Sequence, residues 1–230
     1  MSAGVVPEVG RDAEARPRRR AQRVRRLVTA SVVVVATLTV VGRLSTAWMT
    51  ITGRYVYTLG GADPRLSLSD LPQMGSATLR EGTTGTLEDV DLGMRLLGAT
   101  PSLVHAATVG LAAWLLLRVL KGISAGAPFT PAVLRWWSRL TVVLVVGGVT
   151  QAVLDTGAVV YLSSRIGLLF GSGRVSTEQR EAFLGGDYMM TNIATPDWPV
   201  PILVAGLVAL ALTTAFRAGA RLERDVDGVV

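Results

Sequence analysis

The chain has 230 residues, of which 50% are hydrophobic and 17% are charged, and its formal net charge is +6. Charged residues make up about 25% of an average soluble domain, so either the core is unusually apolar or lipid acts as the solvent. The chain contains no cysteine, which excludes disulfide frameworks, thiol catalysis and cysteine-ligated zinc.

The amino-terminal segment, residues 1–26, is strongly basic, with eight arginines against three acidic residues and no aromatic side chain. A nucleic-acid-binding segment would be expected to combine its positive charge with aromatic or base-reading residues, so we do not expect direct binding of nucleic acid. The segment is instead predicted to be disordered and to lie against anionic lipid headgroups, at about 1 kcal/mol per basic residue. The expected headgroup contacts are Arg18, Arg19, Arg20, Arg23, Arg25 and Arg26.

Four stretches without formal charge follow, at residues 27–42, 102–117, 140–154 and 199–216. With their uncharged or interfacial flanks, each reaches about 20 residues, which is enough to cross a hydrocarbon core of about 30 Å. The sequence therefore predicts an all-α integral membrane protein, a four-transmembrane-helix bundle with spans at about 27–49, 97–120, 139–162 and 197–217. Ser45 and Ala47 would also suit cleavage of the first span as a signal peptide, but its long apolar core favours an uncleaved anchor.

Charge alternates between the segments that connect the spans. Residues 118–139 contain four basic residues and no acidic one, whereas residues 43–96 contain five basic and six acidic residues. Because basic residues accumulate in cytoplasmic loops, we expect both termini and the inner corner, residues 121–138, to be cytoplasmic. The loops at 50–96 and 163–196 should then face outward from the cell (plasma or inner) membrane.

Both outer loops carry signals for local structure. In the first, RYVYTL is rich in β-formers, and two short runs flank the turn-forming GTTG at residues 82–85, which predicts a β-hairpin. In the second, Ser176 and Gln179 fit a capping box and Gly185 fits the end of a short helix.

The inner corner contains the stretch GAPFTPAVLRWWSRL, residues 126–140. Pro128 cannot continue a helix, whereas Thr130 can cap the next helix with Pro131 at its first position. We expect Trp136 and Trp137 to lie at the headgroup level, with apolar rings and indole N–H groups in water.

This corner, together with the ending AFRAGARLERDVDGVV, resembles a bacterial membrane-protein family catalogued as domain of unknown function 2975. Gly126, Pro128 and Phe129 match the family's corner, although the Asn that often follows it is missing from PAVLRWW. The matches in the ending are Phe216, Gly219, Leu222, Asp225 and Gly228. The resemblance implies four spans and a partnership with a small helix-turn-helix transcriptional regulator, and it carries no catalytic residue.

Three polar residues lie within the predicted second and third spans. By depth and helical spacing, His105, Gln151 and Asp155 are expected to form an intramembrane polar cluster. Such a cluster can hold helices together, at about 0.6–2 kcal/mol per hydrogen bond, or it can serve proton-linked sensing or transport. The chain has one histidine, so a zinc site there is not expected.

The carboxyl-terminal tail, residues 218–230, is expected to continue the fourth helix into the cytoplasm. Leu222, Val226 and Val229 recur on one helical face, which suits a partner's apolar groove or, equally, packing on the chain's own Pro128–Phe129 corner.

These features predict a regulatory or scaffolding membrane protein that engages a cytoplasmic partner. The alternative is a small transporter, or a transporter subunit, that uses the region of His105 and Asp155; with four spans it would need to form a homo-oligomer. A membrane-embedded enzyme is the weakest hypothesis, because no nucleophile stands with a base in the sequence. No cofactor and no catalytic residue is predicted.

Overall fold

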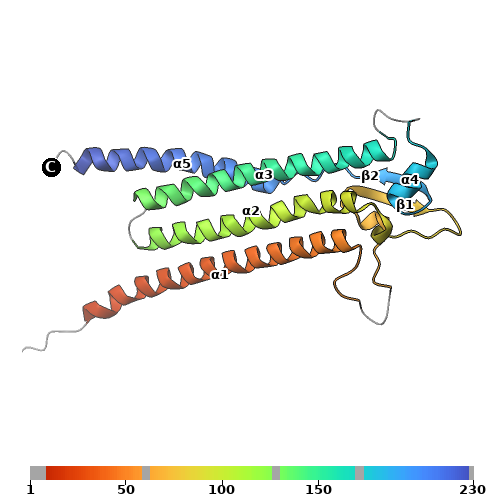
Figure 1. The fold of residues 1–230 in the computed structure, drawn as a ribbon. Helices are drawn as coiled ribbons and strands as arrows, with labels where there is room; N and C mark the ends of the chain where they lie inside the picture. Colours follow the sequence, from red (N-terminus) through yellow and green to blue (C-terminus); the bar gives the residue numbers. More distant parts are fainter. Residues whose placement is uncertain (1–8, 59–62, 126–129, 169–173, 228–230) are drawn as a thin grey trace, which may run out of the picture.

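The computed structural model describes residues 9–58, 63–125, 130–168 and 174–227 (Figure 1). Four long helices run side by side: α1 (Val9–Thr52), α2 (Leu92–Ser124), α3 (Pro131–Arg165) and α5 (Val200–Asp227). All four contain a segment long and apolar enough to cross a membrane, at Arg23–Thr52, Leu92–Ser124, Pro131–Arg165 and Val200–Gly219. The expected number of four helices that could span a membrane is therefore confirmed by length and composition.

The helices form a row rather than a closed bundle. Within the described parts of the chain, α1 packs against α2, α2 against α3, and α3 against α5. The 18-residue apolar stretch of α1 that could lie within a membrane contains no buried residue. A lipid environment would explain the open row of helices, because lipid tails are as apolar as leucine and provide no hydrophobic force to close a bundle.

The two ends of the row differ, and we name them by what they carry. The sheet end holds the connections from α1 to α2 and from α3 to α5, and the terminus end holds the start of α1, the α2–α3 connection and the end of α5 (Figure 1). At the terminus end, α1 already begins at Val9. Helix α1 therefore covers most of the segment, residues 1–26, for which the sequence predicts disorder. Arginine and alanine supply eleven of the eighteen residues from Val9 to Arg26, and both favour helix.

The sheet end contains a two-stranded antiparallel sheet. Its strands are β1 (Met74–Leu79) in the first connection and β2 (Tyr188–Ile193) in the second, with Ala77 opposite Thr191. The predicted hairpin around residues 82–85 is thus wrong, because β1 pairs with the other connection. The run after the turn instead forms the 3-10 helix η2 (Leu87–Asp89), where Thr86 Oγ1 donates a hydrogen bond to Asp89 Oδ2 at 2.7 Å.

The two connections pack together around a shared apolar core. Its buried side chains are Leu66, Leu68, Leu71, Met74, Leu87, Val90, Met94, Leu162, Ile166, Phe183, Leu184 and Tyr188. Because Met94 belongs to α2 and Leu162 to α3, this core also fixes the connections onto the helix ends.

The short helix α4 (Thr177–Leu184) confirms the predicted capping box. Ser176 Oγ accepts from the Gln179 N–H and Gln179 Oε1 accepts from the Ser176 N–H, both at 3.2 Å. Gly185 follows at φ 70°, the left-handed conformation that ends a helix.

At the terminus end, Thr130 is the N-cap of α3 and Pro131 its first residue, as predicted. The corner residues Gly126, Pro128 and Phe129 lie outside the described residues. The predicted continuation of the last span into the tail is confirmed, since α5 extends to Asp227. Leu222 and Val226 belong to this helix, but their side chains, and Val229 as a whole, lie outside what the structure describes.

Candidate functional site

The predicted polar cluster divides into two contacts. In the first, His105 Nδ1 of α2 lies 2.9 Å from Gln151 Oε1 of α3, a hydrogen-bond distance. Gln151 is buried, and the His105 side chain is half-buried. The structure therefore brings these two predicted residues together as a contact between neighbouring helices.

Asp155, one turn further along α3, has different partners from those predicted. Its Oδ1 accepts a hydrogen bond from Gln73 Nε2 at 3.1 Å, and its Oδ2 accepts one from the Asp197 backbone N–H at 2.6 Å. Gln73 belongs to the first connection, and Asp197 lies three residues before α5. We call these three residues the Asp155 latch, because a carboxylate only 6% exposed holds both connections of the sheet end to α3.

The absence of a side chain at Gly98 of α2 accommodates the Gln73 side chain. Gln73 is 1% exposed, and its Nε2 also approaches the Gly98 carbonyl oxygen at 3.4 Å. A Cβ atom on Gly98 would lie 2.7 Å from Gln73 Oε1, so the missing side chain on α2 leaves room for the amide. The Gln73 carbonyl oxygen in turn accepts a hydrogen bond from the Ala194 N–H at 3.0 Å. Gln73 thereby joins the two connections to each other as well as to α3.

Two further charged groups lie near this polar region. Arg43 of α1 and Asp197 both lie within electrostatic range of the His105 ring. Arg43 is half-buried inside the first apolar segment. Trp198, the residue after Asp197, also contacts α3, since its Nε1 donates a hydrogen bond to Thr156 Oγ1 at 3.1 Å. Charged residues at membrane depth are costly and commonly functional, so Arg43 belongs to the candidate site.

Sequence reasoning missed Gln73, Arg43 and Asp197. Gln73 is a single amide in a polar loop, and Asp197 contributes a backbone N–H that any residue except proline would supply. Arg43 stands directly after the uncharged stretch 27–42, and the prediction assigned its charge to the outer loop. Gly98, inside an otherwise apolar helix, was a usable signal for a close approach.

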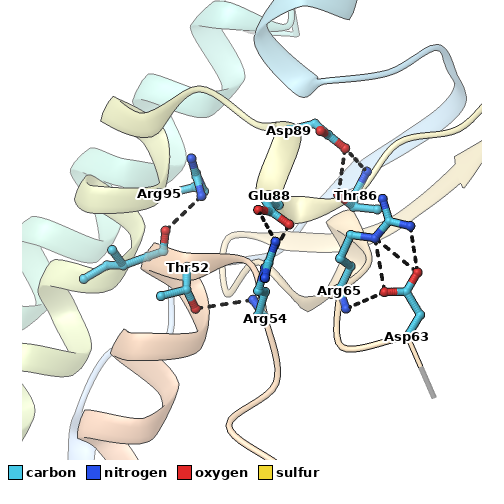
Figure 2. Close-up of polar contacts among 9 residues, drawn as sticks. Thr52, Arg54, Asp63, Arg65, Thr86, Glu88, Asp89 and Arg95 are labelled. Carbon is cyan, nitrogen blue, oxygen red and sulfur yellow. Dashed lines mark hydrogen bonds and ion pairs between the residues drawn. The ribbon is translucent and has the colours of Figure 1, made fainter. Parts of the chain in front are cut away.

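One arginine joins the two ends of the first connection, and another joins α2 to the end of α1 (Figure 2). Arg54 donates to both carboxylate oxygens of Glu88, at 2.7 and 3.1 Å, and Arg95 Nη1 donates to the Ile51 carbonyl oxygen at 2.9 Å. Gly53, at φ 70°, lets the chain pass close to Glu88, whose backbone N would lie 2.5 Å from a Cβ at that position. These contacts hold the start and the end of the first connection together.

Electrostatic effects at these surface pairs follow from the same geometry. The hydrogen bond and charge of Glu88 raise the pKa of Arg54 above its usual value. Hydrogen bonds from Arg65 lower the pKa of Asp63 below its usual value. Both pairs are exposed to solvent, so they orient the loop more than they stabilise it.

The remaining predicted residues lie at the terminus end. Arg23, Arg25 and Arg26 are exposed on α1, whereas the side chains of Arg18, Arg19 and Arg20 lie outside what the structure describes. The expectation of an indole N–H in water is wrong for Trp137, whose Nε1 donates to the Ala209 carbonyl oxygen of α5 at 3.1 Å. A buried partner was available there because α3 and α5 pack closely at this level.

No family model, curated protein or solved structure matches this chain.

The resemblance to a family described above therefore stays a prediction. Among the residues that the structure describes, no group of three His, Cys, Asp or Glu side chains could hold a metal ion. What the site offers is a buried carboxylate that connects the sheet end mechanically to α3.

Proposed function

We propose that this chain is a multi-pass protein of the plasma or inner membrane that regulates or scaffolds a cytoplasmic partner. In this proposal the sheet end lies outside the cell and the terminus end lies in the cytoplasm. Four helices of sufficient length and hydropathy support the membrane location, and the alternation of basic and mixed-charge loops supports the orientation.

The Asp155 latch is the observation that carries the regulatory role. A ligand or protein that moved Gln73 or Asp197 would remove donors from a buried carboxylate, and the loss of one such donor costs about 1.5–3 kcal/mol. That free energy is large enough to change the balance between two arrangements of α3 and α5. The sheet end can therefore influence the helices energetically and not only cover them.

The path from the latch to the terminus end runs along α3 and α5, which remain in contact. Thr141 Oγ1 and Thr213 Oγ1 lie 3.1 Å apart. Nearer the terminus end, Trp137 packs edge-on against Phe216, with ring centroids 5.6 Å apart. A shift of α3 at the latch would therefore carry α5 with it, and α5 leads to the proposed partner surface.

The partner surface that we propose is the part of α5 beyond its apolar segment. The uncharged run ends at Phe216 and the helix at Asp227, so the helix projects about 16 Å further at 1.5 Å per residue. This projection carries Leu222 and Val226, whose spacing suits an apolar groove on a partner. A small transcriptional regulator is the partner that the family resemblance implies.

The transporter alternative receives less support from the geometry. A transported solute or proton would have to exchange partners with the polar groups in each cycle. His105 and Asp155 both hydrogen-bond to protein groups, and the partners of Asp155 are structural parts of the sheet end.

The proposal can be tested with a photo-crosslinking amino acid placed at Leu222 in living cells. We expect a discrete product with a cytoplasmic protein, and we expect Asp155→Asn to change its yield at equal protein abundance. His105→Ala is the matched control, because it removes an intramembrane polar contact outside the latch. Equal yields in the parent protein and the latch variant would contradict regulation through Asp155, and the absence of any product would contradict the partner surface.

A further inference from the structure

A groove of about 780 Å³ opens at the terminus end between α2 and α3 and reaches Arg217 of α5. We call it the Trp–Arg groove, after the side chains that form its rim: Trp114, Arg135, Trp136, Arg139 and Arg217. Its volume lies within the range of small-molecule sites, about 300–1,000 Å³. The Asp155 latch plays no part in it.

Aromatic rings hold two arginines in place, Arg139 on the rim and Arg118 beside it. Trp114 and Trp136 meet edge to face, with centroids 5.6 Å apart. The Arg118 guanidinium lies 5.0 Å from the Trp114 ring centre and 5.6 Å from that of Trp136, and Arg139 lies 5.0 Å from the Trp136 ring centre. A guanidinium stacked on a ring keeps its N–H groups available at the edge, where they match a phosphate.

The polarity of the groove changes along the helix axes. Leu111 lies seven residues before Arg118 on α2, and Val142 lies seven residues after Arg135 on α3, so both apolar residues lie about 10 Å further from the terminus end. Both are more than half exposed, at 52% and 57%. Basic groups therefore surround the rim, and apolar side chains line the deeper part.

This gradient suits an amphiphile with a negative head. No acidic residue lines the groove among the described residues, so the positive charge of the rim is not neutralised from within the lining. An acidic peptide would satisfy the rim but would leave the apolar part unfilled. A phospholipid with a negative headgroup would fill both parts.

We infer that the Trp–Arg groove binds one anionic phospholipid of the cytoplasmic leaflet. Its phosphate lies at Arg118, Arg135 and Arg139, and an acyl chain lies along Leu111 and Val142. The inference depends on the membrane location and orientation proposed above. It goes beyond a general attraction to the membrane surface, because it places one lipid at one site.

Native mass spectrometry of the full-length protein tests the inference. The protein is purified in detergent and exposed to an equimolar mixture of phosphatidylglycerol and phosphatidylcholine that have the same acyl chains. We expect one phosphatidylglycerol to be retained in preference to phosphatidylcholine. We expect Arg139→Gln to reduce this preference about tenfold, the lower end of the effect of one hydrogen bond to a charged group.

Two further variants make the test specific. Leu111→Phe narrows the apolar part without changing the charge, and it should reduce the retention of phosphatidylglycerol if an acyl chain lies there. Arg23→Gln removes one positive charge from the same end of the protein but on α1, and it measures the general attraction of a basic surface. The unfolding temperatures of all variants are compared, so that loss of fold is not mistaken for loss of binding.

Three results would overturn the inference: equal retention of the two lipids, equal loss of preference in Arg23→Gln and Arg139→Gln, or displacement of the lipid by inorganic phosphate or an acidic peptide. A protein that is absent from the membrane fraction of cells would instead contradict the proposed location. The failure of the groove and the failure of the proposed function are therefore distinguishable.

Discussion

The hydrogen bond between Gln73 and Asp155 should contribute measurably to stability, and a double-mutant cycle isolates it. In Gln73→Ala, Oδ1 of a carboxylate only 6% exposed loses its side-chain donor, which should cost about 1.5–3 kcal/mol. Asp155→Ala leaves two donors without their acceptor, the Gln73 amide and the Asp197 N–H. At about 1–3 kcal/mol for each unsatisfied group, the cost should reach about 2–6 kcal/mol.

The double variant should lose less than the sum of the two single losses, because the shared bond is removed only once. We expect a coupling of about 1.5–3 kcal/mol, well above the scatter of about 0.3–0.5 kcal/mol for independent sites. The free energy of unfolding can be followed through the fluorescence of the five tryptophans during denaturant titration in mixed micelles.

The combination of Gln73→Ala with His105→Ala serves as the control cycle. His105 hydrogen-bonds to Gln151 and to none of the three latch residues, so these two losses should add. If the Gln73–Asp155 cycle were additive within about 0.5 kcal/mol, the two side chains would not interact, and the latch would have to be withdrawn.

Three further predictions concern the sheet end and its contact with α2. Ala77 and Thr191 lie opposite each other in the sheet, so cysteines introduced at both positions should form an intramolecular disulfide on oxidation. The absence of a band shift on a non-reducing gel would argue against the β1–β2 pairing. Gly98→Ala should lower the free energy of unfolding by about 1–3 kcal/mol, because its Cβ would meet Gln73 Oε1. Gly42 has open space around it, so Gly42→Ala should leave the free energy of unfolding unchanged or raise it by up to about 1 kcal/mol. Equal effects of the two substitutions would refute the packing argument. Burial and the nearby Asp89 raise the pKa of Tyr188 to about 12, so the contribution of Tyr188 to stability should be complete below pH 10 and lost between pH 10 and 12. Tyr188→Phe should weaken this alkaline loss of stability. A pH profile of stability that is unchanged in Tyr188→Phe would contradict the raised pKa.

Features with local causes could be predicted from the sequence. The apolar helices follow from stretches without charge, and the start of α3 follows from Thr130 and Pro131. The capping box of Ser176 and Gln179 follows from a spacing of three residues. In each case the signal and the structure lie within one or two helical turns, so no tertiary information was needed.

Features that join distant segments could not be predicted. RYVYTL has strong β propensity, yet among its described residues the regular pairing is one isolated bridge between Arg54 and Arg65. β1 pairs instead with β2, which belongs to the other connection, because the two connections bury a common apolar core. Strand propensity reflects the surroundings of a strand more than its backbone, so the sequence could not identify the partner.

The candidate site shows the same division. Helical depth placed His105 near Gln151 correctly, because both lie on regular helices whose rise per residue is known. Asp155 was identified as a site residue, but its partners come from irregular loops whose path the sequence does not specify. A buried carboxylate indicates that donors must be close, and it does not indicate which segments supply them.

The orientation of the protein in the membrane is the claim on which the rest of the account depends, and cysteine labelling in intact cells tests it most directly. The chain has no cysteine of its own, and Thr84 at the sheet end and Ser124 at the terminus end are both exposed. With a membrane-impermeant thiol reagent, Thr84→Cys should be labelled in intact cells, and Ser124→Cys only after the cells are opened. Labelling of Ser124→Cys but not of Thr84→Cys in intact cells would contradict the proposed orientation, and with it a partner surface in the cytoplasm.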